Sequence, residues 1–286
     1  RKKGFVLGVC LLLLLLLPGL NKAEEEKPAS KKINFAVKLS GGMNYLALGD
    51  INAHLKGFSD FFKDQARLED KTAEGEFKKI HSGLDFEGDV IVYLTPQFGI
   101  SLGSGYIHGK KDKDVNKIIS VGRTFSVEVN VSAIPVRLGA YYSLPISSKA
   151  EFFLNGGLGY YFAKWSEDWP DLSLSKEANA SGIGFYGGVG FEFNLASNIA
   201  FVIEAQGRYA KIGGFEGTSK DTFFQCTEEG KLYYFEWFPW TYKWYPMIDI
   251  SKEKPSGPKV DRIRNVREAR VDFSGFALRA GIKINL

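Results

Sequence analysis

The sequence predicts an all-β fold, a transmembrane barrel of eight antiparallel, up-and-down strands. Three observations predict it. Polar and apolar residues alternate with a period of two along eight segments, as they do on strands. The connections alternate between tight turns and long loops, which is the organisation of membrane-spanning barrels. The last eight residues form a strand whose one face, made of Ala280, Ile282, Ile284 and Leu286, is apolar to the end of the chain.

The first element is a predicted signal peptide at residues 1–23. Arg1, Lys2 and Lys3 form its basic start, an apolar run follows from Phe5 to Leu17, and cleavage is expected after Ala23. That run is shorter than the ~20 apolar residues that a spanning helix needs. Residues 24–286 then form one all-β domain.

The strands of this domain follow in order. We expect them at 33–45, 84–94, 98–106, 124–144, 152–162, 183–193, 199–209 and 271–286. In the fourth strand the apolar set changes parity at Ile134-Pro135. Because proline cannot donate to a strand ladder, we expect a bulge there. Tight turns are expected at 95–97, 145–149 and 196–198, and long loops near 49–80, 109–123, 164–182 and 212–270.

The first long loop contains a predicted amphipathic helix at 52–66. Asn52 is the expected N-cap, and Leu55, Phe58 and Phe62 share one face. Such a helix covers the barrel mouth or lies among lipid head groups.

The C-terminus carries a pattern of its own: polar Arg279, small Gly281, and apolar Ile284 and Leu286. Together with eight strands in long-short order, it resembles the small eight-stranded outer-membrane barrels of the OmpA transmembrane domain, OmpX, OmpW and opacity-protein type. The resemblance covers residues 32–286 through pattern rather than identity. It implies export to the periplasm, insertion into the outer membrane by the barrel-assembly machinery, short periplasmic turns, extracellular loops, and contact with outer-membrane lipid and lipopolysaccharide. Those proteins usually end in Phe, so Leu286 implies weaker recognition or a differently tuned assembly machine.

Charge and cysteine content exclude several functions. The signal peptide holds four of the 37 basic residues, so the formal charge of +4 falls to zero, with 33 basic and 33 acidic residues left. This removes the main support for nucleic-acid binding. Cys226 is the one cysteine outside the signal peptide, so neither an internal disulfide nor a thiolate metal site is expected.

Charged residues occupy the inward parity of the predicted strands. The expected lumen cluster comprises Lys38, Asp85, Glu87, Asp89, Arg137, Glu192, Glu204, Arg208, Arg279 and Lys283. Eight strands enclose a space that side chains can fill, and an unpaired buried charge is costly. We therefore expect pairing, with Lys38 facing the strand of Glu87, and Glu204 facing that of Arg279. The cluster is either a polar plug or the lining of a narrow pore.

Candidate catalytic and metal residues are few. His81 and Ser82 are adjacent on a strand and so point to opposite faces; His108 takes the lipid-facing parity, and Glu128 could orient a base only by supposition. His54 with Asp50, Asp60 and Asp64 is better explained as a solvated loop than as a metal site. We therefore predict no catalytic, cofactor or metal site.

The last loop is rich in aromatic residues. A possible binding surface for a ligand or surface partner includes Tyr234, Trp237, Trp240 and Trp244. The alternative is that the strands extend beyond the membrane and pack these rings. The predicted function is a non-enzymatic outer-membrane barrel with a structural or surface-recognition role. A narrow passive channel for small or apolar solutes, as OmpW resemblance implies, is the alternative, and a lipid-modifying enzyme comes third.

Overall fold

The computed structural model describes residues 34–255 and 262–286, so the predicted signal peptide lies outside the described residues. The described chain is mainly antiparallel β-structure with one α-helix. Within it, no helix combines the length and the apolar character that crossing a bilayer demands.

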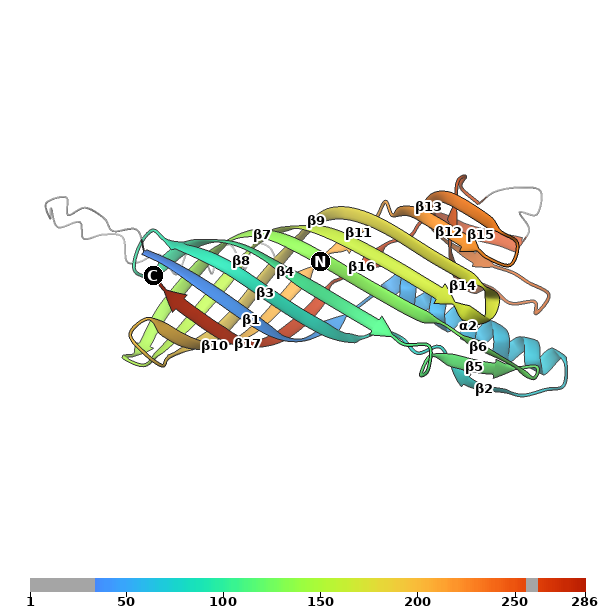
Figure 1. Cartoon of the computed structure of the whole chain (residues 1–286), viewed down its shortest axis with the longest axis horizontal. Coiled ribbons are helices and arrows are strands. Elements are labelled where there is room, and N and C mark those ends of the chain that lie inside the picture. The colour runs from blue at the N-terminus through green and yellow to red at the C-terminus, as the bar shows by residue number, and fades with distance from the viewer. Residues whose placement is uncertain (1–33, 256–261) are drawn as a thin grey trace, which may run out of the picture. The chain divides into compact units, whose positions relative to one another are not determined.

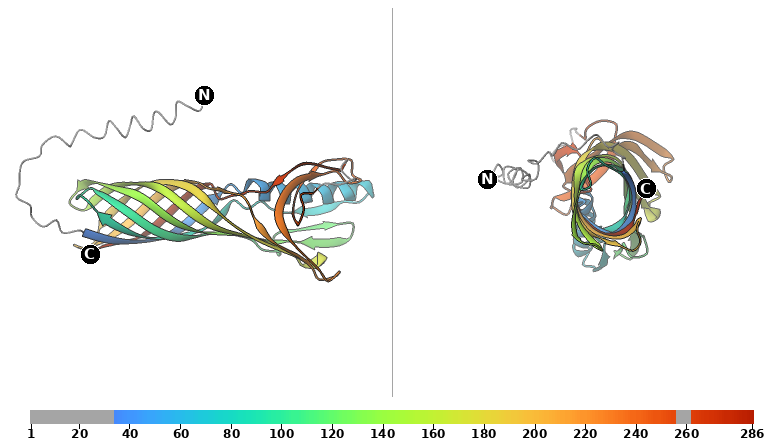
Figure 2. Two further views of the ribbon diagram at one scale, coloured as in Figure 1. Left: turned by 90° about the horizontal axis from the view of Figure 1, so that it is seen from above. Right: turned by 90° about the vertical axis from the view of Figure 1, so that its left-hand side faces the viewer.

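Eight strands of the largest sheet form a closed ring (Figure 1). Each strand pairs antiparallel with two neighbours, and β17 pairs with both β10 and β1, which confirms that the C-terminal strand closes the ring. Figure 2 shows the ring from one end. Its members are β1 (Asn34–Leu46), β3 (Ser82–Tyr93), β4 (Phe98–Lys111), β7 (Glu128–Ser147), β8 (Ala150–Trp169), β9 (Leu174–Asn194), β10 (Ile199–Tyr209) and β17 (Gly275–Asn285).

Tight turns and the C-terminus occupy one end of the ring, and the remaining elements gather at the other (Figure 1). We call this second part, with the adjoining ends of β7, β8 and β9, the head. Its elements are α2 (Gly49–Leu68), the three-stranded sheet of β2 (Ala73–Glu76), β5 (Lys117–Ser120) and β6 (Arg123–Ser126), the pair of β11 (Lys211–Ile212) and β16 (Val271–Asp272), the short helix η1 (Pro170–Leu172), and β12 (Glu216–Asp221), β13 (Cys226–Trp237), β14 (Tyr245–Ser251) and β15 (Ile263–Glu268).

The two faces of the ring have opposite polarity. Large apolar side chains point outward and are exposed, as with Leu39 at 60% and Met43 at 66%. Inward positions of the same strands hold buried charged residues, such as Lys38 and Glu204. A water-soluble sheet protein has the reverse arrangement.

The polarity reverses partway along the strands, where the ring meets the head. In β7, Ile134, Val136 and Leu138 point outward, whereas Val129 and Val131 are buried inside. The pairing between β7 and β8 runs through this point without a shift of register. The predicted bulge at Ile134-Pro135 is therefore wrong. The side chains of β7 continue to alternate between the inner and the outer face without interruption. What changes is that the apolar residues lie on the outer face in the ring and on the inner face in the head.

The same reversal explains why the predicted loop at 164–182 is wrong. β8 continues to Trp169 and β9 begins at Leu174, so only residues 170–173 connect them. Trp165 and Trp169 are fully buried on the inside of the head, while the outer face of these segments is polar. The alternation in this hairpin has the opposite sense to that of the ring, apolar inside and polar outside, and so it does not match the pattern that predicts the ring strands.

The helix α2 starts earlier than predicted, at Gly49, and the residue before it, Leu48, has a left-handed backbone with φ 45°. Asn52 is not the N-cap. Its amide nitrogen donates to the carbonyl oxygens of Ala47 (3.0 Å) and Ile80 (2.9 Å), and its oxygen accepts the N–H of Ile80 (2.8 Å). These bonds hold the start of the helix above the end of the ring.

The buried face of α2 covers the mouth of the ring, one of the two predicted placements. Ile51, Leu55 and Phe62 belong to the same apolar core as Leu46 and Ile107 from the ends of ring strands. The interior of the head and the interior of the ring are thus continuous.

Candidate functional site

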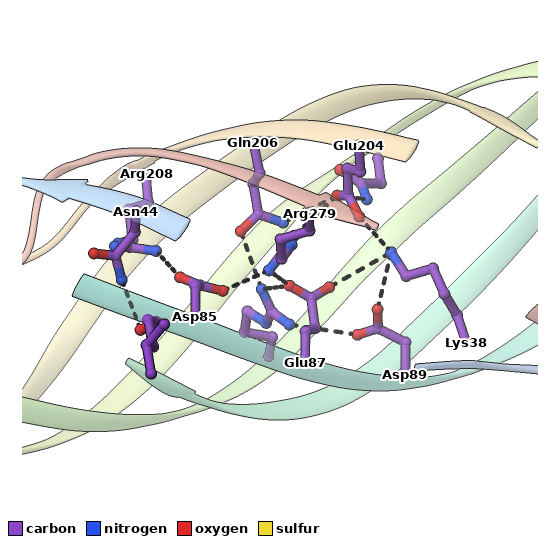
Figure 3. A network of polar contacts seen from close by, with 12 residues as sticks. Lys38, Asn44, Asp85, Glu87, Asp89, Glu204, Gln206, Arg208 and Arg279 are labelled. Atoms are coloured by element: carbon purple, nitrogen blue, oxygen red, sulfur yellow. Dashed lines mark hydrogen bonds and ion pairs between the residues drawn. The ribbon is translucent and has the colours of Figure 1, made fainter. Parts of the chain in front are cut away.

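Eight of the inward charges of the ring form one network, shown in Figure 3. Lys38 lies near three carboxylates: its Nζ is 2.9 Å from Glu204 Oε2, 3.1 Å from Asp89 Oδ2 and 3.5 Å from Glu87 Oε1. Asn155 donates a further hydrogen bond of 2.7 Å to Glu204. One lysine therefore joins carboxylates from β3 and β10, on opposite sides of its own strand in the ring order.

Three arginines complete the network. Arg279 contacts Asp85 (2.9 Å), Glu204 (3.1 Å) and Glu87. Arg208 also pairs with Asp85 (2.5 Å), and Arg137 pairs with Glu87 (2.5 Å). The charges balance, because four cations (Lys38, Arg137, Arg208, Arg279) face four carboxylates (Asp85, Glu87, Asp89, Glu204).

This network fills the cross-section of the ring at its level. The side chains of Lys38 and Glu87 are each 1% exposed, and that of Glu204 is 0% exposed. These side chains therefore have almost no contact with water. Glycine makes the packing possible: a Cβ atom on Gly103 would collide with the Asp89 carboxylate, and one on Gly188 would crowd Glu204.

The other two predicted members of the lumen cluster form a separate group. Lys283 contacts Glu192, donates to the Tyr93 hydroxyl (2.9 Å), and shares Glu192 with the Tyr141 hydroxyl. The Phe153 ring stacks on Tyr141 with centroids 5.0 Å apart. Aromatic rings thus fill the interior beside this second ion pair.

The head contains a buried polar group that sequence reasoning missed. His54 Nε2 lies 3.0 Å from Glu167 Oε2, and Nδ1 accepts the backbone N–H of Ile248 at 3.1 Å, an arrangement that assigns the proton to Nε2. The indole of Trp169 donates to Glu167 (2.6 Å), and Lys176 pairs with Asp249 (2.7 Å). Glu167 escaped notice because it lies in the segment expected to be a loop.

Burial by itself would raise the pKa of the Glu167 carboxyl. His54, the nearby Lys176 and the Trp169 indole outweigh burial and lower that pKa below its ordinary value. The group connects α2 with β8, β9 and β14. Both ring nitrogens of His54 make hydrogen bonds within this group, so the imidazole ties α2 to β8 and β14.

The three carboxylates that the sequence groups with His54 are each paired with a cation. Asp50 pairs with Arg267 (2.6 Å), Asp64 with Lys243 (2.9 Å), and Asp60 with Lys56. In the part of the chain that the structure describes, no group of three potential ligands gathers.

The residues considered for catalysis also lie apart. His81 stacks on Tyr45 (5.3 Å), His108 stacks on Tyr106 (5.8 Å), and Glu128 pairs with Lys110 (3.0 Å). Within residues 34–255 and 262–286, no hydrogen bond joins His81, Ser82, His108 and Glu128 to one another.

The four aromatic residues of the predicted loop surface bind parts of the head together. Trp237 and Trp240 pack on Phe61 of α2, with centroids 5.1 and 5.7 Å apart. Arg267 lies over Tyr234 at 4.2 Å, and Arg264 over Trp244 at 4.1 Å, which are cation–π distances. Trp240 remains 52% exposed.

The four residues of the predicted assembly signal lie on the closing strand or at its end. Arg279 belongs to the charge network, and Gly281 lies against the backbone of Ser40 in β1. Ile284 and Leu286 point outward and are exposed, and the Leu286 N–H donates to the carbonyl of Phe35 (2.8 Å).

A ring with no free edge, apolar outside and charged inside, has the properties that a bilayer requires of a spanning sheet. The chain belongs to the outer membrane protein β-barrel domain family, which it matches over residues 10–225. This confirms the resemblance to small outer-membrane barrels.

Two solved structures are similar over most of their length. The outer-membrane protease OmpT of Escherichia coli is 7% identical, with a TM-score of 0.44 and coverage of 92% of this chain and 99% of that one. The transport unit of the autotransporter AIDA-I of Escherichia coli is 11% identical, with a TM-score of 0.34 and coverage of 97% of both chains. No curated protein gives a significant match.

Proposed function

We propose that this chain spans the outer membrane as a closed eight-stranded barrel without enzymatic activity. The tight turns and Leu286 lie in the periplasm, and the head is displayed outside as a structural or surface-recognition element. Membership of the outer membrane protein family supports the location in the outer membrane. The exposed apolar side chains around the ring, which we call the apolar band, support a membrane-spanning ring: the ten steps from Phe35 to Tyr45 cover ~34 Å of strand, or ~25 Å of height at the usual tilt of a membrane barrel.

The polarity reversal supports the position of the outer membrane boundary. Below it, the exposed face of the sheet suits hydrocarbon, and above it, the polar outer face suits water. Tyr106 and Tyr209, exposed near the reversal, are residues that favour such an interface.

The filled interior is the observation that carries the proposal of a closed barrel. The balanced network blocks one level, and the apolar core beneath α2 covers the mouth. A passive channel needs a water-accessible path past Lys38 and Glu204, and both are buried here. The channel is therefore the less supported function.

Conductance across planar bilayers tests this proposal. Purified protein, shown to be folded by its heat-shifted gel mobility, is expected to give no steady current after insertion. Protease protection of the inserted ring strands controls for failed insertion. A steady ohmic current from folded, inserted wild-type protein would overturn the closed barrel in favour of the channel.

The native Cys226 offers a test of orientation, because it is exposed at the start of β13 in the head. A membrane-impermeant maleimide is expected to label it on intact cells. The matched control is Cys226→Ser with Ser197→Cys in a tight turn, which is expected to react only after the outer membrane is permeabilised. The opposite labelling pattern would reverse the proposed orientation.

A further inference from the structure

A groove of about 690 Å³ lies on the outer face of the ring, where β4, β7, β8 and β9 reach the polarity reversal. The segment that leads from β11 into β12 forms its far wall through Gly213, Gly214 and Glu216. No residue of the charge network lines this groove.

The lining of the groove is divided. Tyr106, Ile134 and Phe162 form an apolar part that continues the exposed band of the ring. Ser132, Asn179 and Ser181 form a polar part with hydroxyl and amide groups. The Ser181 hydroxyl also lies 2.6 Å from that of Tyr160, which places two further hydrogen-bonding atoms beside the rings. Such a division suits a ligand that has both a polar head and an apolar tail.

The charges of the groove disfavour a phosphate. Its cation, Lys164, is already paired at 2.7 Å with Glu177, and a second carboxylate, Glu216, lines the wall. An anionic head group would therefore meet no net positive charge, whereas phosphate sites use unpaired Arg or Lys. Carboxylate, amide and hydroxyl groups together can donate to and accept from an uncharged polyhydroxyl head.

We propose that this groove binds a neutral glycolipid of the outer leaflet. The sugar head lies against the rings of Tyr106 and Phe162 and exchanges hydrogen bonds with Asn179, Ser181 and Glu216, while the acyl chains follow the apolar band. This inference rests on the proposed function, because the groove faces lipid only when the band is in the bilayer.

Native mass spectrometry of protein released from nanodiscs tests the proposal. The discs contain phosphatidylcholine with equal amounts of monogalactosyl diacylglycerol and phosphatidylglycerol. Wild-type protein is expected to retain the galactolipid in preference. Ser181→Trp places an indole in the groove and is expected to lower this retention about tenfold, the factor that corresponds to ~1.4 kcal/mol.

The matched control is Ser82→Trp, which makes the same change at an exposed serine near the reversal on β3, outside the groove. It is expected to retain galactolipid as wild-type does. The glycolipid site would be overturned if wild-type protein preferred phosphatidylglycerol or retained both lipids alike. It would also be overturned if the two variants lost galactolipid retention equally. Protein that inserts and shows no preference contradicts this inference alone, whereas failure of folded protein to insert contradicts the proposed function.

Discussion

Replacing Glu204 by leucine should destabilise the barrel through the charges that it leaves behind. Glu204 contacts both Lys38 and Arg279, so its removal leaves four buried cations with three carboxylates. Removing one partner of a buried ion pair typically costs about 3–5 kcal/mol, a large part of the roughly 5–15 kcal/mol that holds a domain folded.

A second substitution shows whether the loss of stability comes from an unpaired charge or from lost packing. Lys38→Met added to Glu204→Leu restores the balance, with three cations and three carboxylates. We expect the pair to be more stable than the sum of the single effects by roughly 2–3 kcal/mol, as for strongly coupled neighbours. Lys111→Leu, at the end of β4 and outside the network, serves as the control, with an expected change within about 0.5 kcal/mol.

The measurement is urea unfolding of protein refolded into lipid vesicles, followed by heat-shifted gel mobility and tryptophan fluorescence. Equal stability of Glu204→Leu and Lys111→Leu would refute the reasoning. So would strict additivity in the double variant, since it would show that the loss came from packing and not from an unpaired charge.

Three further outcomes are expected. Leu278→Arg, on the exposed band where Leu278 is 60% exposed, should cost ~2–4 kcal/mol in the same unfolding assay; no cost would place this face outside the bilayer. Leu286→Asp should reduce folded protein in outer-membrane fractions while purified refolding stays normal, and Leu286→Phe should preserve or improve assembly; normal accumulation of Leu286→Asp would exclude a sorting role. The lowered pKa of Glu167 means that its ionised form stabilises the head above the ordinary value of 4.5, and that this contribution disappears as pH falls through the lowered pKa. Hydrogen exchange at the Ile248 amide should therefore lose protection in acid in wild-type but depend less on pH in Glu167→Gln; identical profiles would contradict this assignment.

The ring was predictable from sequence because its strands follow one simple alternation of polar and apolar residues. Where the interior is charged and the exterior apolar, alternation alone identifies β1, β3, β10 and β17, and the pairing of Lys38 with Glu87 follows from parity. The head was not predictable in the same way. There Trp165 and Trp169 are apolar on the inner parity, so a search for one sense of alternation ends too early.

The contacts of the head are also distant in sequence. His54 and Glu167 are 113 residues apart, and their pairing depends on how a helix from one connection lies against strands from others. Asn52 illustrates a second limit: it has the residue type of an N-cap, yet its amide is engaged with Ile80. A local pattern cannot distinguish a cap from a tertiary anchor.

The uninterrupted passage of β7, β8 and β9 through the polarity reversal has a mechanical consequence. These strands are 20, 20 and 21 residues long, so each extends over roughly 65–70 Å at the usual rise per residue. They have no joint between the ring and the head, and their ladder of hydrogen bonds resists bending. In the proposed orientation, anything grasped by the tip of the β8–β9 hairpin is held at a fixed height and angle to the cell surface, and a pull there is transmitted directly to the strands of the ring.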